Sequence, residues 1–246
     1  MPALGCETEL RVSEPDAATL VLGDEDAAFS RGGNRLCFVD PRDANRCIKV
    51  ARPDRSPAIK RSEAGFPKNL KPLSSFDDNC EEARVYARID RSIGPAAFEL
   101  VPRLHGTVAT QYGPGLCFDL LRDDDGRIAV TLKQYLWQRG LDAALSAPLA
   151  EFGARWQALG MPSRRLLTHN ILVQCAGGEP RRLWVIDGLG WPDLLPLAYA
   201  SRALARRKAA RRVADLDSAI AEQLAKRGDR AQFGYHGWLD EAQRQR

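Results

Sequence analysis

The chain has 246 residues, of which 44% are hydrophobic and 28% charged, and its formal net charge is +4. This length and composition are typical of a folded protein with one large domain or two small ones, and they argue against wholesale disorder. The mildly basic charge does not by itself require a nucleic-acid partner, although the positive charge is unevenly spread. No apolar run is long enough to span a bilayer, and the N-terminus lacks the pattern of a secretory signal, so we expect a cytoplasmic protein without a membrane partner.

The first half of the chain alternates short apolar runs with turn-forming residues, which predicts β-strands. We expect strands at ATLVLG (18–23), LCFVD (36–40), CIKV (47–50), VPRLHGTVAT (101–110) and LCFDLL (116–121). The glycine-bearing SRGGNR (30–35), PRDANR (41–46) and YGPG (112–115) are predicted turns. Residues 51–76 are rich in Pro, Lys, Arg and Ser without periodicity, so a long irregular connection is predicted there.

The second half is mainly helical by its periodicity. Helices are predicted at 129–140, 142–159 and roughly 197–226, and a small β-hairpin is predicted between the first pair and the last. Strands first and helices second predict an α+β protein with two lobes. LLRDDDG (120–126) is the natural seam, so we expect a β-rich lobe over 1–121 and a helical lobe over 122–246.

The six cysteines are scattered, with no C-x-x-C pair, and only three histidines are present. In a reducing compartment this pattern favours unpaired thiols over disulfides or a zinc site.

Lys49 lies inside the CIKV strand, on the same face as Cys47. A lysine there either reaches the surface from an edge strand or serves a site, and the residue alone does not decide between the two. A helix is predicted from Asp78 to about Ile93. On it, Glu82 shares the inward face with Tyr86, whereas Glu81 lies on the solvated face, so we expect Glu82 to pair with a cation such as Lys49.

Asn170 and Asp187 form the strongest candidate pair. Asn170 begins the apolar run ILVQ, while Asp187 ends LWVI and is followed by Gly188, which permits a sharp turn. An amide and a carboxylate at the ends of adjacent strands can hold one Mg²⁺ together with phosphate oxygens. The alternative is a plain Asp-Gly turn with Asn170 as a strand cap.

A lysine in a strand, a glutamate on the next helix, an asparagine and an Asp-Gly pair follow one another in the order found in kinases. The segments GGNRLCFVDPRDANRCIKV, LHGTVATQYGPGLCFDLLRDDDGRIAVTLKQYL, NILVQ and LWVIDGLG also resemble the YrbL family of PhoP-regulatory-network proteins, which are kinase-like. The resemblance implies a two-lobed protein-kinase-like fold with ATP and Mg²⁺ between the lobes. By motif match it implies nucleotide contacts at Gly32, Gly33, Lys49 and Glu82, and metal ligands at Asn170 and Asp187.

Arg165 departs from the kinase pattern. It follows Arg164 at the position where kinase-like catalytic loops place an aspartate, so a permanent cation replaces an anionic base. A missing general base typically costs about 10²- to 10⁴-fold in rate. His169 is the neighbouring group with a suitable pKa for a substitute base, although a histidine beside a metal ligand is more often structural.

The predicted last helix carries a dense basic stripe. Arg207, Lys208, Arg211 and Arg212 share one face, opposite alanines and Val213. Such a stripe is usually a solvated face, but an anionic partner is the alternative.

Three functions remain open from the sequence. The first is a nucleotide-gated regulator that is catalytically weak, a pseudokinase, because of Arg165. The second is an active small-molecule or protein kinase with a substitute base. The third is a basic binding or scaffold protein without nucleotide, and the protein or small-molecule partner is not identified.

Overall fold

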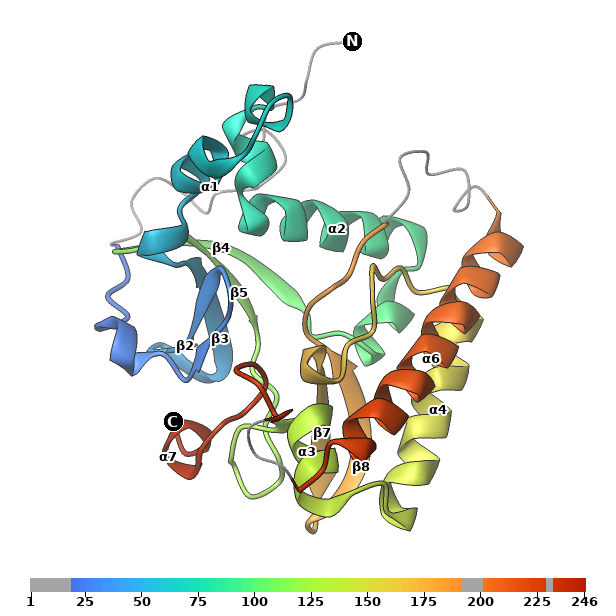
Figure 1. Ribbon diagram of the computed structural model, residues 1–246. Coiled ribbons are helices and arrows are strands. Elements are labelled where there is room, and N and C mark those ends of the chain that lie inside the picture. The colour runs from blue at the N-terminus through green and yellow to red at the C-terminus, as the bar shows by residue number, and fades with distance from the viewer. Residues whose placement is uncertain (1–18, 192–200, 229–231) are drawn as a thin grey trace. The chain divides into compact units, whose positions relative to one another are not determined.

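The computed structural model describes residues 19–191, 201–228 and 232–246 (Figure 1). The chain divides into two compact units, Met1–Ala87 with Arg103–Leu120, and Arg88–Pro102 with Leu121–Arg246. The segment Arg88–Pro102, which we expected in the first lobe, therefore belongs to the second unit. A β-sheet dominates the first unit and helices dominate the second, which confirms the α+β class.

The first unit is built on a five-stranded antiparallel sheet in the order β1-β2-β3-β5-β4. Its strands are β1 (Ser30–Arg31), β2 (Arg35–Asp40), β3 (Asp43–Ala51), β4 (Leu104–Thr110) and β5 (Gly113–Asp119). The turns predicted at 41–46 and 112–115 are shorter than expected, because β3 and β5 begin inside them.

The strand expected at 18–23 does not form in the described residues. Leu20 makes only an isolated bridge to Thr110. The N–H of Leu22 donates to Oε1 of Gln111 at 2.7 Å, so a side chain takes the bond that a strand neighbour would have made.

Register places the core on one face of the sheet. Leu36 pairs with Val50 and Phe38 pairs with Ile48, and all four side chains are buried together. Because side chains alternate along a strand, the intervening Lys49 points to the other face.

Two helices follow β3. The segment 51–76 is not wholly irregular, since it contains α1 (Pro57–Glu63), which Ser56 caps and Pro57 begins. Helix α2 (Asp78–Ser92) confirms the predicted helix. Asp77 caps it by accepting from the N–H groups of Asn79 (2.9 Å) and Cys80 (3.3 Å).

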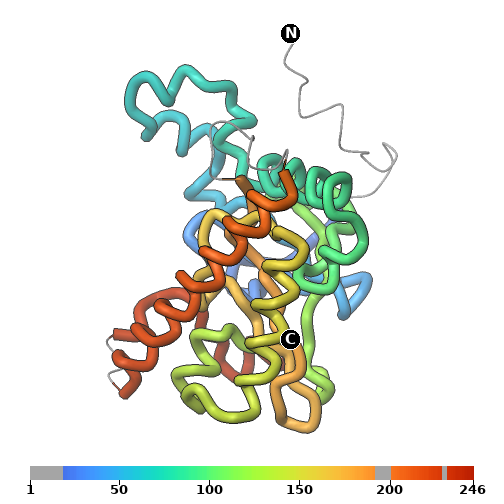
Figure 2. Tube along the Cα trace, turned by 90° about the vertical axis from the view of Figure 1, so that its right-hand side faces the viewer, coloured from blue at the N-terminus to red at the C-terminus, as the bar shows by residue number. Residues whose placement is uncertain are grey.

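The second unit combines helices with a three-stranded sheet in the order β6-β7-β8. Its elements are β6 (Val130–Thr131), α3 (Leu132–Arg139), α4 (Ala143–Leu159), β7 (Ile171–Ala176), β8 (Glu179–Val185), α6 (Arg202–Ala225) and α7 (Glu241–Arg244). Helices α4 and α6 run side by side in both views (Figures 1 and 2). Trp156 of α4 is fully buried within this unit.

Two predicted helix starts differ from the structure. The helix expected at 129–140 begins at Leu132, because Val130 and Thr131 pair with β7 and Thr131 then caps α3. The last helix is described from Arg202, and residues 197–200 of the predicted span lie outside the described residues.

Among the cysteines in the described part of the chain, the prediction of unpaired thiols is wrong for Cys80. Cys80 is disulfide-bonded, whereas Cys37, Cys47, Cys117 and Cys175 are free thiols. Among the described residues, no helix has the length and apolar character needed to cross a membrane.

Candidate functional site

Lys49 and Glu82 form a buried ion pair in the first unit. Nζ of Lys49 lies 3.0 Å from Oε1 of Glu82, and their side chains are both 9% exposed. This confirms the prediction that Glu82 is the partner. The edge-strand alternative for Lys49 is wrong, because β3 lies between β2 and β5 in the sheet.

The surroundings of the ion pair fix it from two sides. Nζ of Lys49 lies 4.4 Å from the ring centroid of Phe118 on β5. Asn79, in the first turn of α2, donates to the backbone oxygens of Lys49 (3.2 Å) and Pro114 (3.1 Å). The start of α2 is thereby held against β3 and β5, which brings Glu82 over Lys49.

Arg35 is a member of this cluster that the sequence did not reveal. Its guanidinium pairs with Oε2 of Glu82, and its side chain is 12% exposed. Arg35 lies on the same face of β2 as Cys37, and Cys37 is the residue that pairs with Lys49. Only the strand register brings the two cations to one carboxylate.

Gly32 and Gly33 lie in the turn between β1 and β2. The N–H of Gly32 donates to the backbone oxygen of Arg35 at 2.8 Å. Arg52 donates to the oxygens of Gly32 (3.1 Å) and Gly33 (3.2 Å). Arg52 directly follows β3, so these bonds hold the turn next to the end of the strand that carries Lys49. The contact of this turn with nucleotide stays a prediction.

Asn170 and Asp187 come together at one end of the β7–β8 hairpin. The backbone oxygen of Asn170 accepts from the N–H of Ile186 at 2.9 Å. Oδ1 of Asp187 accepts from the N–H of Gly188 at 2.6 Å. Gly188 has a φ of +79°, and a Cβ there would lie 3.2 Å from Nδ2 of Asn170. The amide of Asn170 therefore lies against the Asp187–Gly188 turn, and the binding of one ion by Asn170 and Asp187 stays a prediction.

Arg165 flanks this turn. The N–H of Arg164 donates to the oxygen of Gly188 at 2.8 Å, and Ser163 bridges Leu189. The backbone oxygen of Arg165 lies 3.0 Å from the position that a Cβ of Gly188 would take. The Arg165 side chain is exposed. The loop with the arginine and the loop with the aspartate are thus direct backbone neighbours.

His169 is half-buried in the single 3-10 turn Thr168–Asn170. Burial lowers the pKa of His169, the charges of Lys133 and His236 lower it further, and Asp187 opposes them. Its ring centroid lies 5.9 Å from that of His236. His236 belongs to a segment far away in sequence, which gave no signal of this neighbour.

The donor set at Asn170 and Asp187 is small. Within the described part of the chain, no group of at least three His, Cys, Asp or Glu side chains is arranged to hold a metal. An amide and a carboxylate suit Mg²⁺, which commonly uses one or two protein ligands and completes its shell with water and phosphate oxygens. The residues present therefore fit a nucleotide-borne Mg²⁺ better than a resident metal.

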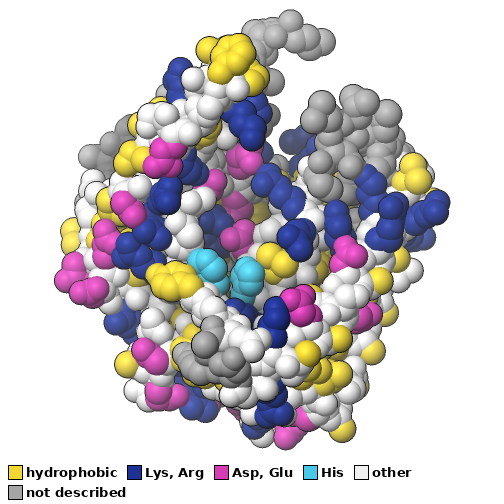
Figure 3. All heavy atoms as spheres, viewed as in Figure 1, with side chains coloured by type: hydrophobic (Ala, Val, Ile, Leu, Met, Phe, Trp, Pro, Cys, Tyr) yellow, Lys and Arg dark blue, Asp and Glu magenta, His cyan; other side chains and the backbone are white. Residues whose placement is uncertain are grey.

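The basic stripe of α6 is largely accessible. Arg207 and Arg211 are exposed, Lys208 and Arg212 are half-buried, and Arg212 pairs with Asp215 at 3.0 Å. On the opposite face Ala209 is 1% exposed and Ala210 and Val213 are half-buried, whereas Ala203 is exposed, so the apolar face is only partly buried. Dark-blue Lys and Arg side chains gather over the upper part of α6 in Figure 3.

Comparison with known families matches residues 21–220 to the family described as PhoP regulatory network protein YrbL. The chain belongs to the YrbL family. The match includes Lys49, Glu82, Asn170 and Asp187, and it ends before the last part of the chain.

This YrbL-family chain is 28% identical over 187 residues to "Uncharacterized protein YrbL" of Escherichia coli strain K12, covering 75% of the chain and 80% of that relative. The same values hold for the protein of that name from Shigella flexneri. Among solved structures, Rad53 1-466 in complex with AMP-PNP is similar with a TM-score of 0.46 and 11% identity. That match covers 82% of this chain and 51% of the Rad53 chain.

Proposed function

We propose that this YrbL-family protein is a kinase-like regulator that binds ATP with Mg²⁺ and transfers phosphate poorly or not at all. The observation that carries the proposal is the junction at Gly188, where Asn170 and the Arg164–Arg165 loop meet the turn that begins with Asp187. The proposed Mg²⁺-binding pair and the backbone of Arg165 therefore meet at one turn.

The first unit supplies the phosphate contact in this proposal. A buried lysine held by a glutamate is fixed in direction, which suits the binding of phosphate oxygens. Asn79 supports this role because it holds the backbone of Lys49 to α2. Lys49, with Gly32 and Gly33 of the neighbouring turn, is the proposed nucleotide contact of the unit.

The second unit supplies the metal contact. Asn170 and Asp187 would hold the ion that the nucleotide brings, and the ion would neutralise phosphate charge. Arg165 lies at the position of the general base. Its guanidinium cannot accept a proton at neutral pH, but it can donate charged hydrogen bonds to phosphate. With arginine in place of the catalytic aspartate, the protein is expected to bind ATP but to transfer its phosphate inefficiently.

A protein that binds nucleotide without efficient turnover can act as a regulator if two conformations differ in affinity for the ligand. The family description, which names a regulatory network, supports this choice. The basic face of α6, on which Arg207 and Arg211 are exposed and Lys208 and Arg212 are half-buried, is the proposed contact for an anionic partner. That partner is separate from the nucleotide.

Thermal unfolding with ATP, with and without Mg²⁺, tests the proposal. We expect Mg²⁺-ATP to raise the melting temperature of the wild type more than ATP alone does, and Asp187→Asn to abolish this Mg²⁺-dependent rise. Asp217→Asn, an exposed aspartate of α6, is the matched control and should keep the rise. If Mg²⁺-ATP does not change the melting temperature of the wild type, nucleotide binding is excluded, and a basic binding protein remains as the function.

Turnover then separates the regulator from an active kinase. A steady-state ATP assay should give a rate well below the roughly 1 to 100 per second of ordinary kinases. A rate within that range would show that another group acts as base, and His169→Gln would be the first variant to measure.

A further inference from the structure

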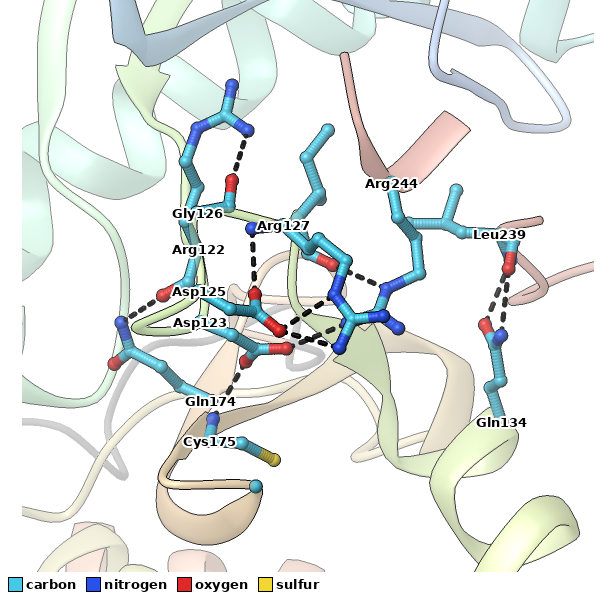
Figure 4. Close-up of polar contacts among 12 residues, drawn as sticks. Arg122, Asp123, Asp125, Gly126, Arg127, Gln134, Gln174, Cys175, Leu239 and Arg244 are labelled. Atoms are coloured by element: carbon cyan, nitrogen blue, oxygen red, sulfur yellow. Dashed lines mark hydrogen bonds and ion pairs between the residues drawn. The ribbon is translucent and has the colours of Figure 1, made fainter. Parts of the chain in front are cut away.

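The last residues of the chain, Gln232–Arg246, form a strap over the second unit that lies beyond the matched family residues. The strap contacts the connection that follows β5, then α3, and then the turn that carries His169. Figure 4 shows its far end, where Arg244 and Leu239 meet Asp123 and Gln134.

Arg244 anchors the far end of the strap. Its Nη2 lies 2.8 Å from Oδ2 of Asp123, and its Nε donates to the oxygen of Ile128 at 3.0 Å. The backbone oxygen of Arg244 accepts from the N–H of Ile128 at 2.8 Å. Asp123 is only 9% exposed and also accepts from the N–H of Cys175 at 2.8 Å. These contacts join the far end of the strap to the connection after β5 through one side chain and the backbone.

Gln134 holds the middle of the strap. Its side-chain amide donates to the oxygen of Leu239 at 2.8 Å and accepts from the N–H of the same residue at 2.9 Å. Both bonds are buried. Beside them, the ring of Phe233 packs edge-on against Trp137 of α3 and against Trp238, with centroids 5.3 and 5.2 Å away.

The near end of the strap lies on the candidate metal turn. Thr131 donates to the oxygen of Gly237 at 2.5 Å, and Lys133 donates to the oxygen of His236 at 2.9 Å. Gly237 has a φ of +88°, and a Cβ there would lie 2.7 Å from Cβ of His169. The backbone of the strap thus touches the residue directly before Asn170, and only glycine leaves room for that approach.

We propose that the strap is a positioning element for Asn170. The turn Thr168–Asn170 is only three residues long. Besides the bond of Asn170 to Leu167 within the turn, its backbone accepts one bond from Ile186 at the end of the hairpin. The contact of Gly237 with His169 supports it from the side of the strap. The inference rests on the proposed function, since it assigns the strap a role in Mg²⁺ binding. Residues that orient a metal ligand typically contribute about 10- to 100-fold in metal affinity.

Gly237→Ala tests the proposal, with Gly234→Ala as its matched control. Both glycines have a positive φ, +88° and +74°, so both substitutions strain the backbone of the same segment. A Cβ at 234 would meet only the flexible end of Lys133 at 3.9 Å, whereas a Cβ at 237 collides with His169. Gly237→Ala should therefore displace the turn, and Gly234→Ala should not.

The first measurement is the Mg²⁺ concentration that gives half of the ATP-dependent rise in melting temperature. We expect an increase of about tenfold or more for Gly237→Ala and less than about twofold for Gly234→Ala. The smaller shift produced by ATP without Mg²⁺ should be equal in the three proteins, because the strap acts on the metal ligand. Equal Mg²⁺ requirements in both variants, or an equal loss of ATP affinity without Mg²⁺, would overturn the proposal.

The second measurement needs no nucleotide. In the free protein, the NMR signals of the His169 ring and of the Asn170 side-chain amide should move in Gly237→Ala and stay in place in Gly234→Ala. Arg244→Ala, which releases the far anchor, should move the same signals and replaces Gly237→Ala if that variant does not fold. If these signals move but Mg²⁺-ATP does not raise the melting temperature of the wild type, the proposed function is refuted, whereas the contact of the strap with His169 is supported. Signals that stay would refute the strap's role.

Discussion

Removing the carboxylate of Glu82 should destabilise the first unit far more than removing that of Glu81. Glu82→Gln leaves Lys49 and Arg35 without their shared counter-charge, and these side chains are 9% and 12% exposed. Breaking a buried ion pair from one side costs about 3 to 5 kcal/mol. We expect about 3 kcal/mol, the lower end, because the amide oxygen of the substituted side chain can still accept one hydrogen bond.

Glu81→Gln is the matched control on the same helix. The sequence predicted Glu81 on the solvated face, but the structure has it half-buried in the first turn of α2. The loss of a negative charge near a helix N-terminus costs about 0.3 to 1 kcal/mol. Chemical denaturation at neutral pH should therefore separate the two variants by about 2 kcal/mol. In a double-mutant cycle, Lys49→Met should cost less in the Glu82→Gln background than in the wild type, since it then removes a buried charge that has lost its Glu82 partner. Equal losses for Glu81→Gln and Glu82→Gln, or purely additive effects in the cycle, would refute the pairing as a source of stability.

Three further predictions concern Arg165, Asp40 and Gly188. Arg165→Asp and Arg165→Ala should each weaken ATP binding by about 1.5 to 3 kcal/mol in a titration. Only the aspartate variant should gain ATP turnover. Tighter ATP binding by either variant would contradict a contact between Arg165 and phosphate. Hydrogen bonds from Arg42 hold the pKa of the Asp40 carboxyl below its ordinary 3.8. That stabilisation is present above pH 3.8 and is lost as the pH falls through the pKa of the folded state. At neutral pH, Asp40→Asn should therefore lower the free energy of unfolding by about 1 kcal/mol, a small value because the Arg42 side chain is exposed. This difference from the wild type should disappear in acid. A deficit that does not depend on pH would contradict this assignment. Gly188→Ala should cost about 1 to 3 kcal/mol more than Gly113→Ala, because both have a positive φ but only position 188 has neighbours within reach of a Cβ, and equal losses would contradict the contact.

The sequence by itself determined the local elements and two relations within the candidate site. Periodicity predicted the strands near Lys49 and the helix Asp78–Ser92, because burial of one face imposes a fixed spacing on apolar residues. The same spacing selected Glu82 over Glu81. The apolar runs on either side of a polar turn predicted the hairpin that joins Asn170 to Asp187, and these residues are close because the connection between them is short.

Tertiary structure decided the contacts between segments that are distant along the chain. Register across the β-sheet brought Arg35 to Glu82, although 47 residues separate them. Strand pairing at Thr131 shortened α3, where helical periodicity alone predicted an earlier start. The strap meets Gln134 from 105 residues away, and Gly237 fits against His169 only because both backbones approach closely. Such pairings depend on which surfaces are buried together and on whether there is room for a single Cβ atom. Local sequence patterns do not indicate either, because the partners are far apart along the chain.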